Sequence, residues 1–289
     1  MSLTLSQLLE EGTDRLMKAG VEEAAIDARY LLLEAFHTDL THFLIERNRI
    51  LSAKEESGES VRDFYRMLGL RSERIPLQQI TGSREFMGLD FFVNEHVLIP
   101  RQDTETLVEQ ILKDYKGRNP RILDLCTGSG CIAVSLAKLG GFESVVAADI
   151  SEEALNVAKR NGEAILGKEK IIFLLSDLFN AFKEDELFDV IVSNPPYIPT
   201  EVMKDLQPEV RDHEPVLALD GKEDGLYFYR RLAAESRNYL NPGGAVYLEI
   251  GYDQKDAVST LLEEAGFIKI RSWCDAAGMD RVVSGVLEN

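Results

Sequence analysis

The chain has 289 residues, of which 45% are apolar, and a formal net charge of −18 at pH 7. This length predicts one domain of about 200 residues with a smaller domain beside it. No window approaches the roughly 18 uninterrupted apolar residues of a membrane span. The start of the chain also lacks the basic and apolar regions of an export signal. We therefore expect a soluble, cytoplasmic protein without a membrane partner.

Composition also argues against metal and nucleic-acid sites. Cys126, Cys131 and Cys274 form no CxxC pair, which disfavours a metal site and fits a reducing compartment. Nucleic-acid binders normally need a basic surface to displace counterions, and no run of Lys or Arg stands out here. We expect no direct nucleic-acid partner. The acidity would complement a partner with a basic surface, although it also serves solubility alone.

Residues 1–75 predict a small helical bundle. Capping boxes at Thr4 and Ser52 mark two helix starts, Gly20 is a plausible stop, and a third helix is expected from about Leu40. The second helix is expected to bury residues at helical spacing, namely Ile26, Tyr30, Leu33 and Phe36. Such amphipathic stripes are more typical of a core than of a binding surface.

Residues 76–102 predict a linking hairpin. Glu85–Val93 contains two short apolar runs around Gly88, as expected of two strands and a turn. An amphipathic helix should follow Pro100–Glu105. We expect the third region, residues 103–289, to form the larger domain.

From Arg121 the pattern alternates between strands and helices. Strands are expected at 122–125, 145–149, 171–175, 187–193, 245–250, 268–273 and 281–287, and helices at 131–139, 152–161, 226–240 and 254–265. This alternation predicts an α/β fold with a parallel sheet covered on both faces. The last two strands are joined by a short link, so they can pair with each other only in the antiparallel sense.

The strand expected at 187–193 runs into Asn194-Pro195-Pro196-Tyr197. Proline has no backbone N–H, so the strand must end there. An amide, a proline carbonyl and an aromatic ring are thus presented at the carboxyl end of a strand, where ligands bind in open α/β sheets. The Asn194 oxygen and the Pro195 carbonyl can each accept one N–H of a planar NH2 group, while Tyr197 packs on its face. The alternative is a simple turn that closes a core strand.

A second motif lies upstream. Gly128-x-Gly130 follows a strand and opens a helix, which lets the backbone approach a ligand closely. Asp149 ends the next strand, where a carboxylate can accept hydrogen bonds from ribose hydroxyls. Because Ala133 completes a dinucleotide fingerprint, a nicotinamide enzyme is an alternative interpretation.

Three features favour S-adenosylmethionine as the cofactor. Asp124 precedes the glycine turn, as in the Asp-x-x-x-Gly-x-Gly motif of Rossmann-like methyltransferases. Asp177 and Leu178 follow the third strand, where such enzymes hold adenine. The terminal antiparallel strand is the third feature. Helix capping or turn formation is the alternative role for Asp124 and Asp177.

With both motifs placed, the chain resembles the HemK-type release factor glutamine N5-methyltransferases over nearly its whole length. Besides the helical N-terminal region, the resemblance rests on Gln79-Ile80-Thr81-Gly82-x-x-Glu85-Phe86-x-Gly88, Ile99-Pro100-Arg101, the turn around Gly128, Asn194-Pro195-Pro196-Tyr197-Ile198-Pro199, Ala218-Leu219-Asp220-Gly221-x-x-Asp224-Gly225-Leu226 and Glu249-Ile250-Gly251. Two departures are visible. Cys126 stands where many members have Gly, and Gln102 where many have a second proline.

The resemblance implies a Rossmann-like S-adenosylmethionine-dependent methyltransferase domain with a small N-terminal helical bundle. Its members methylate the side-chain nitrogen of the glutamine in the Gly-Gly-Gln motif of class I peptide release factors and leave S-adenosylhomocysteine. It implies substrate contacts at Asn194, Pro195, Pro196 and Tyr197, and Asn194, Pro195 and Tyr197 are the expected catalytic residues. The implied cofactor contacts are Cys126, Thr127, Gly128, Ser129, Gly130, Asp149, Leu178 and Asn194.

Three alternatives remain at this level. A glutamine methyltransferase of a ribosomal protein would share the Asn194–Tyr197 motif. An adenine or guanine amino methyltransferase would present the same motif to a base, but it needs a basic channel that this acidic sequence does not show. A cofactor-binding module without catalysis is disfavoured by the intact motif. The proton acceptor is not identified.

Overall fold

The computed structural model describes residues 3–167, 170–183 and 185–288. The chain forms two compact units, one of Met1–Gly82 with Gln207–His213, and one of Ser83–Leu206 with Glu214–Asn289. The division predicted at residues 75 and 102 stays a prediction. No helix in the described part of the chain is long and apolar enough to cross a membrane.

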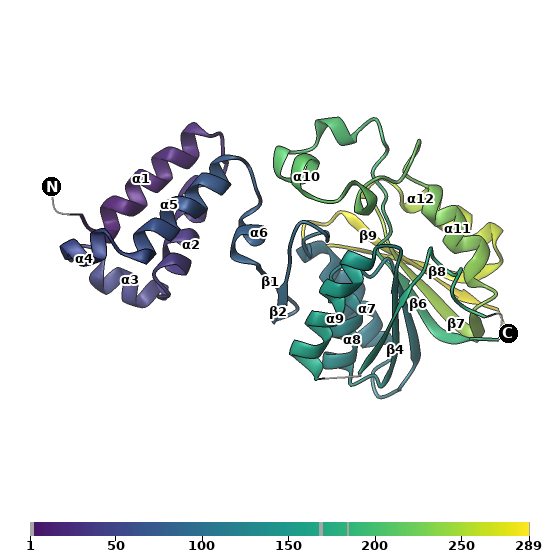
Figure 1. Ribbon diagram of the computed structural model, residues 1–289. Coiled ribbons are helices and arrows are strands. Elements are labelled where there is room, and N and C mark those ends of the chain that lie inside the picture. Colours follow the sequence, from purple (N-terminus) through teal and green to yellow (C-terminus); the bar gives the residue numbers. More distant parts are fainter. Residues whose placement is uncertain (1–2, 168–169, 184, 289) are drawn as a thin grey trace. The chain divides into compact units, whose positions relative to one another are not determined.

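The first unit is helical, as predicted (Figure 1). The Thr4 and Ser52 capping boxes are both formed, because each side chain accepts from the backbone N–H three residues later while Gln7 or Glu55 reaches back. Its helices are α1 (Leu5–Lys18), α2 (Ala24–Ala35), α3 (Leu40–Glu46), α4 (Ala53–Glu56), α5 (Glu59–Ser72), α6 (Leu77–Thr81) and α10 (Pro208–His213).

The predicted core face of α2 was wrong at Ile26 and Tyr30, whereas Leu33 and Phe36 are partly buried against the core. Ile26 and Tyr30 are 41% and 54% exposed, and α2 instead buries Ala24, Asp27, Ala28, Leu31, Leu32 and Ala35. The alanines on this face let α2 pack closely against both α1 and α5. The positions of the large apolar side chains therefore predicted the buried face of this helix only in part.

Buried ion pairs hold α10 within the helical unit, although α10 comes much later in the sequence. Arg71 donates from Nε to Asp27 at 2.7 Å and from an Nη to Glu209 at 2.8 Å. Arg74 donates to both Glu209 oxygens. Burial raises the pKa of Glu209, but hydrogen bonds from Arg74 and Arg71 outweigh it and lower that pKa to about 2.

The second unit begins with the predicted hairpin, in which β1 (Ser83–Phe86) pairs antiparallel with β2 (Leu89–Phe92). Met87 and Gly88 form the turn with positive φ angles of 53° and 72°, the backbone that a two-residue hairpin loop requires.

A seven-stranded sheet follows in the order β5-β4-β3-β6-β7-β9-β8. Strands β3 to β7 pair in parallel, while β9 pairs antiparallel with both β7 and β8, as predicted for the last pair. The strands are β3 (Arg121–Leu125), β4 (Ser144–Asp149), β5 (Ile171–Leu175), β6 (Phe188–Ser193), β7 (Leu240–Glu249), β8 (Phe267–Cys274) and β9 (Asp280–Leu287).

Helices cover both faces of this sheet, which confirms the predicted α/β layering (Figure 1). Ile122 faces one core cluster with α7 and α8, whereas Leu123, the next residue, faces the other with α11 and α12, as expected of strand alternation. The helices of this unit are α7 (Glu105–Asp114), α8 (Cys131–Gly140), α9 (Glu152–Leu166), α11 (Tyr227–Ser236) and α12 (Lys255–Glu264).

The helix predicted at 226–240 is shorter than expected. It ends at Ser236, and Leu240 already belongs to β7, where it pairs with Phe188 of β6. Residues 237–239 form a turn that leads directly into the strand.

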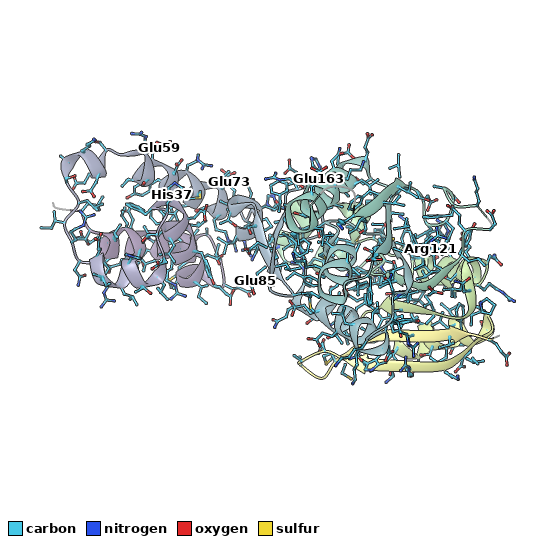
Figure 2. The ribbon with its side chains drawn as sticks, turned by 90° about the horizontal axis from the view of Figure 1, so that it is seen from below. His37, Glu59, Glu73, Glu85, Arg121 and Glu163 are labelled. Atoms are coloured by element: carbon cyan, nitrogen blue, oxygen red, sulfur yellow. The ribbon has the colours of Figure 1, made fainter. Side chains whose placement is uncertain are left out.

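The amino-terminal edge of the sheet is closed by polar contacts. Arg121, labelled in Figure 2, starts β3 and places its guanidinium over the Phe188 ring at 4.5 Å from the ring centroid. The Arg121 backbone N–H donates to one Asp189 oxygen at 2.8 Å, and Asn241 Nδ2 donates to the other at 2.9 Å. Both oxygens of this carboxylate therefore have partners.

Candidate active site

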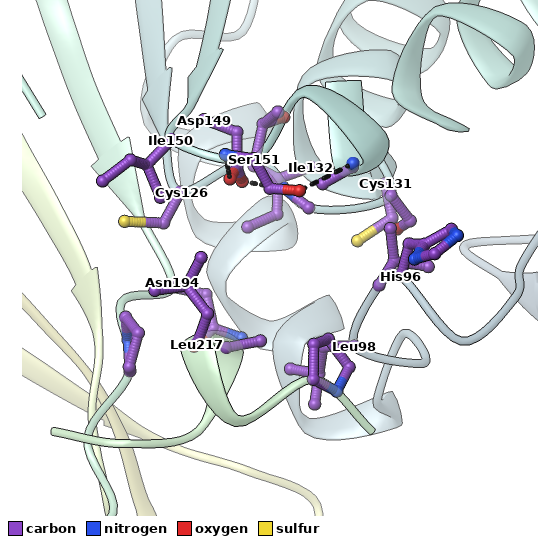
Figure 3. Close-up of a pocket in the computed structure, with 18 of the residues that line it drawn as sticks. His96, Leu98, Cys126, Cys131, Ile132, Asp149, Ile150, Ser151, Asn194 and Leu217 are labelled. Carbon is purple, nitrogen blue, oxygen red and sulfur yellow. Dashed lines mark hydrogen bonds between the residues drawn. The ribbon is translucent and has the colours of Figure 1, made fainter. Parts of the chain in front are cut away.

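A pocket opens at the opposite edge of the sheet, at the carboxyl ends of β3, β4, β5 and β6 (Figure 3). Parallel strands bring their carboxyl ends to one edge, which is where open α/β sheets bind ligands. The lining comes from the segments that follow these four strands and from segments 96–104, 215–218 and Phe228.

The glycine turn after β3 forms one wall of this pocket. Gly128 has a φ of +54° and no atom within 4 Å of where a Cβ would be, so a ligand can approach its backbone closely. A Cβ on Gly130 would come within 3.0 Å of Ala158 Cβ on α9. Gly128 thus leaves room for a ligand, whereas Gly130 allows α8 and α9 to pack and does not line the pocket.

Asp149 ends β4 and lies across from this turn. Its Oδ2 accepts from the Gly128 N–H at 2.8 Å and its Oδ1 from the Ser151 N–H at 3.0 Å. Burial raises the pKa of Asp149, and these backbone hydrogen bonds oppose that rise. Each carboxylate oxygen can accept a further hydrogen bond, so Asp149 can hold a diol.

Asp124 is fully buried behind the turn and does not line the pocket. Its Oδ2 accepts from the Thr127 hydroxyl at 2.6 Å and from the Ala133 N–H at 3.2 Å. Its Oδ1 has no hydrogen-bond partner among the described residues. Burial raises the pKa of Asp124 to about 7. The Asp124 side chain thus stabilises the turn and the start of α8 through one oxygen, while its other oxygen could still accept a hydrogen bond.

Asp177 and Leu178 line the pocket after β5. Asp177 Oδ1 accepts from Arg231 at 2.7 Å. Leu178 is buried and has a φ of +48°, an uncommon backbone for a residue with a Cβ. Ile132, Ile150, Leu217 and Phe228 add apolar surface to the same pocket, which suits a flat ring.

The Asn194–Tyr197 motif is divided between the pocket and the core. Asn194 and Pro196 line the pocket, whereas Pro195 and Tyr197 are not among the lining residues. Tyr197 packs against the core cluster of α11 and α12, and its carbonyl accepts from Gln254 Nε2 at 3.1 Å. Burial raises the pKa of the Tyr197 phenol to about 12. All predicted cofactor contacts except Gly130 line the pocket with Asn194.

Several residues that shape this pocket had no role predicted from the sequence. Thr104 Oγ1 accepts from Asn194 Nδ2 at 3.3 Å. Arg101 donates to both oxygens of the buried Glu214 at 2.8 Å. Ile99-Pro100-Arg101 and Glu249-Ile250-Gly251 were part of the resemblance, so these motifs were visible signals. The pairing of Arg101 with Glu214 has no local sequence signal, because it joins residues far apart in the chain.

The pocket therefore brings together contacts that suit a nucleoside and the side-chain amide of Asn194. Comparisons with known proteins agree with this arrangement. Residues 101–208 match the Methyltransferase small domain model and residues 7–82 match the PrmC N-terminal domain model. A crystal structure of a methyltransferase from Pyrococcus furiosus is 19% identical and covers 71% of this chain and 91% of its own, with a TM-score of 0.52. That likeness shows the fold.

Full-length relatives show the family. A release factor glutamine methyltransferase of Clostridium botulinum is 39% identical over 283 residues, which are 97% of this chain and 98% of that protein. One of Caulobacter vibrioides is 40% identical over 287 residues, covering 99% and 97%. The chain therefore belongs to the release factor glutamine methyltransferase family.

Proposed function

We propose that this protein transfers a methyl group from S-adenosylmethionine to the side-chain amide nitrogen of the glutamine in the Gly-Gly-Gln motif of class I release factors. The observation that carries this proposal is the position of Asn194. It lines the same pocket as Gly128 and Asp149, so an amide acceptor and a nucleoside cofactor would meet there.

The residues present fit S-adenosylmethionine. Asp149 would accept from the ribose hydroxyls, and the open space at Gly128 would admit the amino-acid part of the cofactor. Leu178 and the apolar wall would cover the adenine, and Asp177 would lie beside it. When bound, the cofactor supplies an electrophilic methyl carbon on a positively charged sulfur.

Asn194 and Pro195 would position the acceptor. A carboxamide nitrogen is a poor nucleophile because its lone pair is delocalised into the carbonyl group. If Asn194 Oδ1 and the Pro195 carbonyl each accept one N–H of the glutamine, the nitrogen is held in line with the methyl carbon. Tyr197 packs against the core and does not line the pocket, so it would hold the motif in place without touching the amide. Good alignment can contribute about 7 to 11 kcal/mol to the barrier reduction.

The proposed reaction is a substitution at the methyl carbon of the cofactor. The new N–C bond forms as the C–S bond breaks, the bonding pair remains on sulfur, and the glutamine nitrogen gives up one proton. No pocket side chain is assigned as the acceptor of that proton, and water can serve.

The choice of acceptor is supported by the relatives, whose names specify release factor glutamine. The net charge of −18 also suits an acceptor with a basic surface.

Mass spectrometry of a purified class I release factor incubated with this protein and S-adenosylmethionine tests the proposal. We expect a gain of one methyl group on the Gly-Gly-Gln glutamine. Ribosomal proteins and nucleic acid incubated in parallel should remain unmodified. Methylation of either of these in place of the release factor would overturn the assignment.

A further inference from the structure

One arginine lines the pocket close to Asn194, and the mechanism above does not use it. Arg101 precedes the short 3-10 turn Gln102–Thr104, and its carbonyl accepts from the Thr104 N–H at 3.2 Å. Thr104 Oγ1 in turn accepts from Asn194 Nδ2 at 3.3 Å. Among the described residues that line the pocket, Arg101 is the only arginine or lysine. A cationic donor therefore lies one turn away from the amide that is proposed to hold the acceptor.

A buried carboxylate fixes the Arg101 guanidinium group. Arg101 Nη2 donates to both Glu214 oxygens at 2.8 Å, and the Glu214 side chain is only 1% exposed. A guanidinium group has five N–H donors in a rigid plane, so the donors on Nε and Nη1 remain. No acceptor in the described part of the chain uses them, and the Arg101 side chain is 39% exposed. These donors are held in place and open to a ligand.

Glu214 also makes a cation compatible with the proposed cofactor. S-adenosylmethionine carries a positively charged sulfur, and two like charges in one pocket repel each other. The Glu214 carboxylate compensates the charge of Arg101 at a distance of 2.8 Å. Arg101 can therefore act as a hydrogen-bond donor without repelling the cofactor.

Prolines make other donors scarce at this end of the pocket. Pro100 and Pro215 are the chain neighbours of Arg101 and Glu214, Pro196 follows Asn194 by two residues, and all three prolines line the pocket. Proline has no backbone N–H. A peptide that enters here leaves water, and its carbonyl groups then need donors. Glycine has no side chain, so a Gly-Gly segment presents only backbone groups, and Arg101 can supply the donor that its carbonyl groups need.

Resting on the function proposed above, we propose that Arg101 is a substrate-binding residue that donates from Nε and Nη1 to a glycine carbonyl of the Gly-Gly-Gln segment. The side-chain carbonyl of the glutamine is a less suitable partner. A cation at that oxygen would draw more of the nitrogen lone pair into the amide and weaken the nucleophile. A contact with the backbone holds the acceptor segment without this disadvantage.

The first test is the kinetics of release factor methylation by the full chain. A backbone contact is the same before and during methyl transfer, so its loss should raise KM and leave kcat unchanged. For Arg101→Gln we expect KM for the release factor to rise about 10 to 100-fold, as for the loss of a hydrogen bond to a charged group. The affinity for S-adenosylmethionine, measured by calorimetry, should not fall. An unchanged KM, or a loss that falls on kcat or on cofactor affinity instead, would overturn the proposal.

A double variant separates binding from folding. Arg101→Gln leaves the buried Glu214 without its partner, which by itself destabilises the fold. Combining it with Glu214→Gln removes both charges, and urea denaturation should show a more stable protein than the single variant. KM should nevertheless stay raised, because the donor is still missing. A return to the wild-type KM would assign the effect to Glu214 and overturn the proposal.

Arg271 supplies the matched control. It also pairs with a carboxylate, that of Asp114, but it does not line the pocket. Arg271→Gln removes the same charge and should leave KM for the release factor unchanged. An equal rise of KM in the Arg101 and Arg271 variants would indicate a general effect of charge and contradict a contact made by Arg101.

A peptide probe distinguishes the backbone from the glutamine side chain. In a peptide that contains Gly-Gly-Gln, replacing the amide after either glycine by an ester weakens that glycine carbonyl as an acceptor and leaves the glutamine side chain intact. Binding is measured by calorimetry with S-adenosylhomocysteine present. We expect one of the two esters to weaken binding to the wild type but not to Arg101→Gln. Ester effects that are equal in both proteins at both positions would overturn the proposal.

The wild type distinguishes a failure of this inference from a failure of the proposed function. If the wild type methylates the release factor and the Arg101 variants have the same KM, only the role of Arg101 falls. If the wild type neither methylates the release factor nor binds the peptide, the proposed function falls and the role of Arg101 falls with it.

Discussion

Carboxylates at the two ends of the parallel strands differ in whether both of their oxygens have hydrogen-bond partners. At the amino-terminal edge, both oxygens of Asp189 have hydrogen-bond partners, from the Arg121 backbone and the Asn241 side chain. At the carboxyl edge, Asp124 and Glu249 are more deeply buried, yet each has one oxygen without a partner among the described residues.

This difference indicates where the fold is specialised for binding. A buried polar atom without a partner costs free energy, so each one calls for an explanation, and a bound ligand is one such explanation. Asp189 lies in β6 and accepts hydrogen bonds from the starts of β3 and β7, so it stabilises the sheet. Asp149 lines the pocket, whereas Asp124 and Glu249 are buried and do not line it. The pKa of each of these three carboxyl groups is raised because burial disfavours its charge.

Replacing Asn194 should give the largest effect, and this effect should fall mainly on catalysis. For Asn194→Ala we expect kcat to fall by about 100-fold or more, because the acceptor loses its alignment. Cofactor affinity measured by calorimetry should fall much less. Equal losses of methyl incorporation and of affinity would make Asn194 only a cofactor ligand.

Replacing Asp189 should lower the stability of the protein and leave catalysis unchanged. Asp189→Ala leaves the Arg121 N–H and Asn241 Nδ2 without their partner, and we expect a loss of about 2 kcal/mol in the free energy of unfolding. Urea denaturation measures this loss, and kcat of the folded fraction should be unchanged. A stable variant with impaired catalysis would break the distinction between the two edges.

Asp149 tests the cofactor side of the pocket. Removing a charged acceptor of hydrogen bonds costs about 1.5 to 3 kcal/mol, so Asp149→Ala should weaken S-adenosylmethionine binding by about 10 to 100-fold. Calorimetry at constant pH gives the affinity directly. Retained affinity would contradict a role for Asp149 in holding the ribose.

Asp124→Asn should leave the cofactor contacts in place and change the pH dependence of stability. The pKa of Asp124 is raised from 3.8 to about 7 in the folded protein. Between these values the folded state keeps a proton that the unfolded state releases, so Asp124 makes stability fall as pH rises through this window.

The Asn variant lacks this titration. From pH 4 to pH 7, the free energy of unfolding of the wild type should therefore decrease relative to the variant, by about 1 kcal/mol or more. Denaturation curves at both pH values, without cofactor, measure it. A difference that is independent of pH would mean that Asp124 is ionised in the fold.

Much of the fold could be predicted because its signals are local. Alternating apolar runs predicted the layered sheet, the Thr4 and Ser52 capping boxes predicted helix starts, and the short link at 275–278 required the last two strands to pair antiparallel. The resemblance carried by the motifs around Gly128 and Asn194 predicted the family, which the full-length relatives confirm. The catalytic and cofactor roles of individual residues stay predictions.

The sequence by itself thus determined the order of the elements, the family and the pocket-forming turns, because these depend on neighbouring residues and on strand and helix periodicity. Only the tertiary structure decided that α2 turns its alanine side inward and that Glu209 joins Arg71 and Arg74. It alone placed Thr104 beside Asn194. Such contacts join residues far apart in the chain, and their energies depend on burial and hydrogen-bond direction, which no local pattern records.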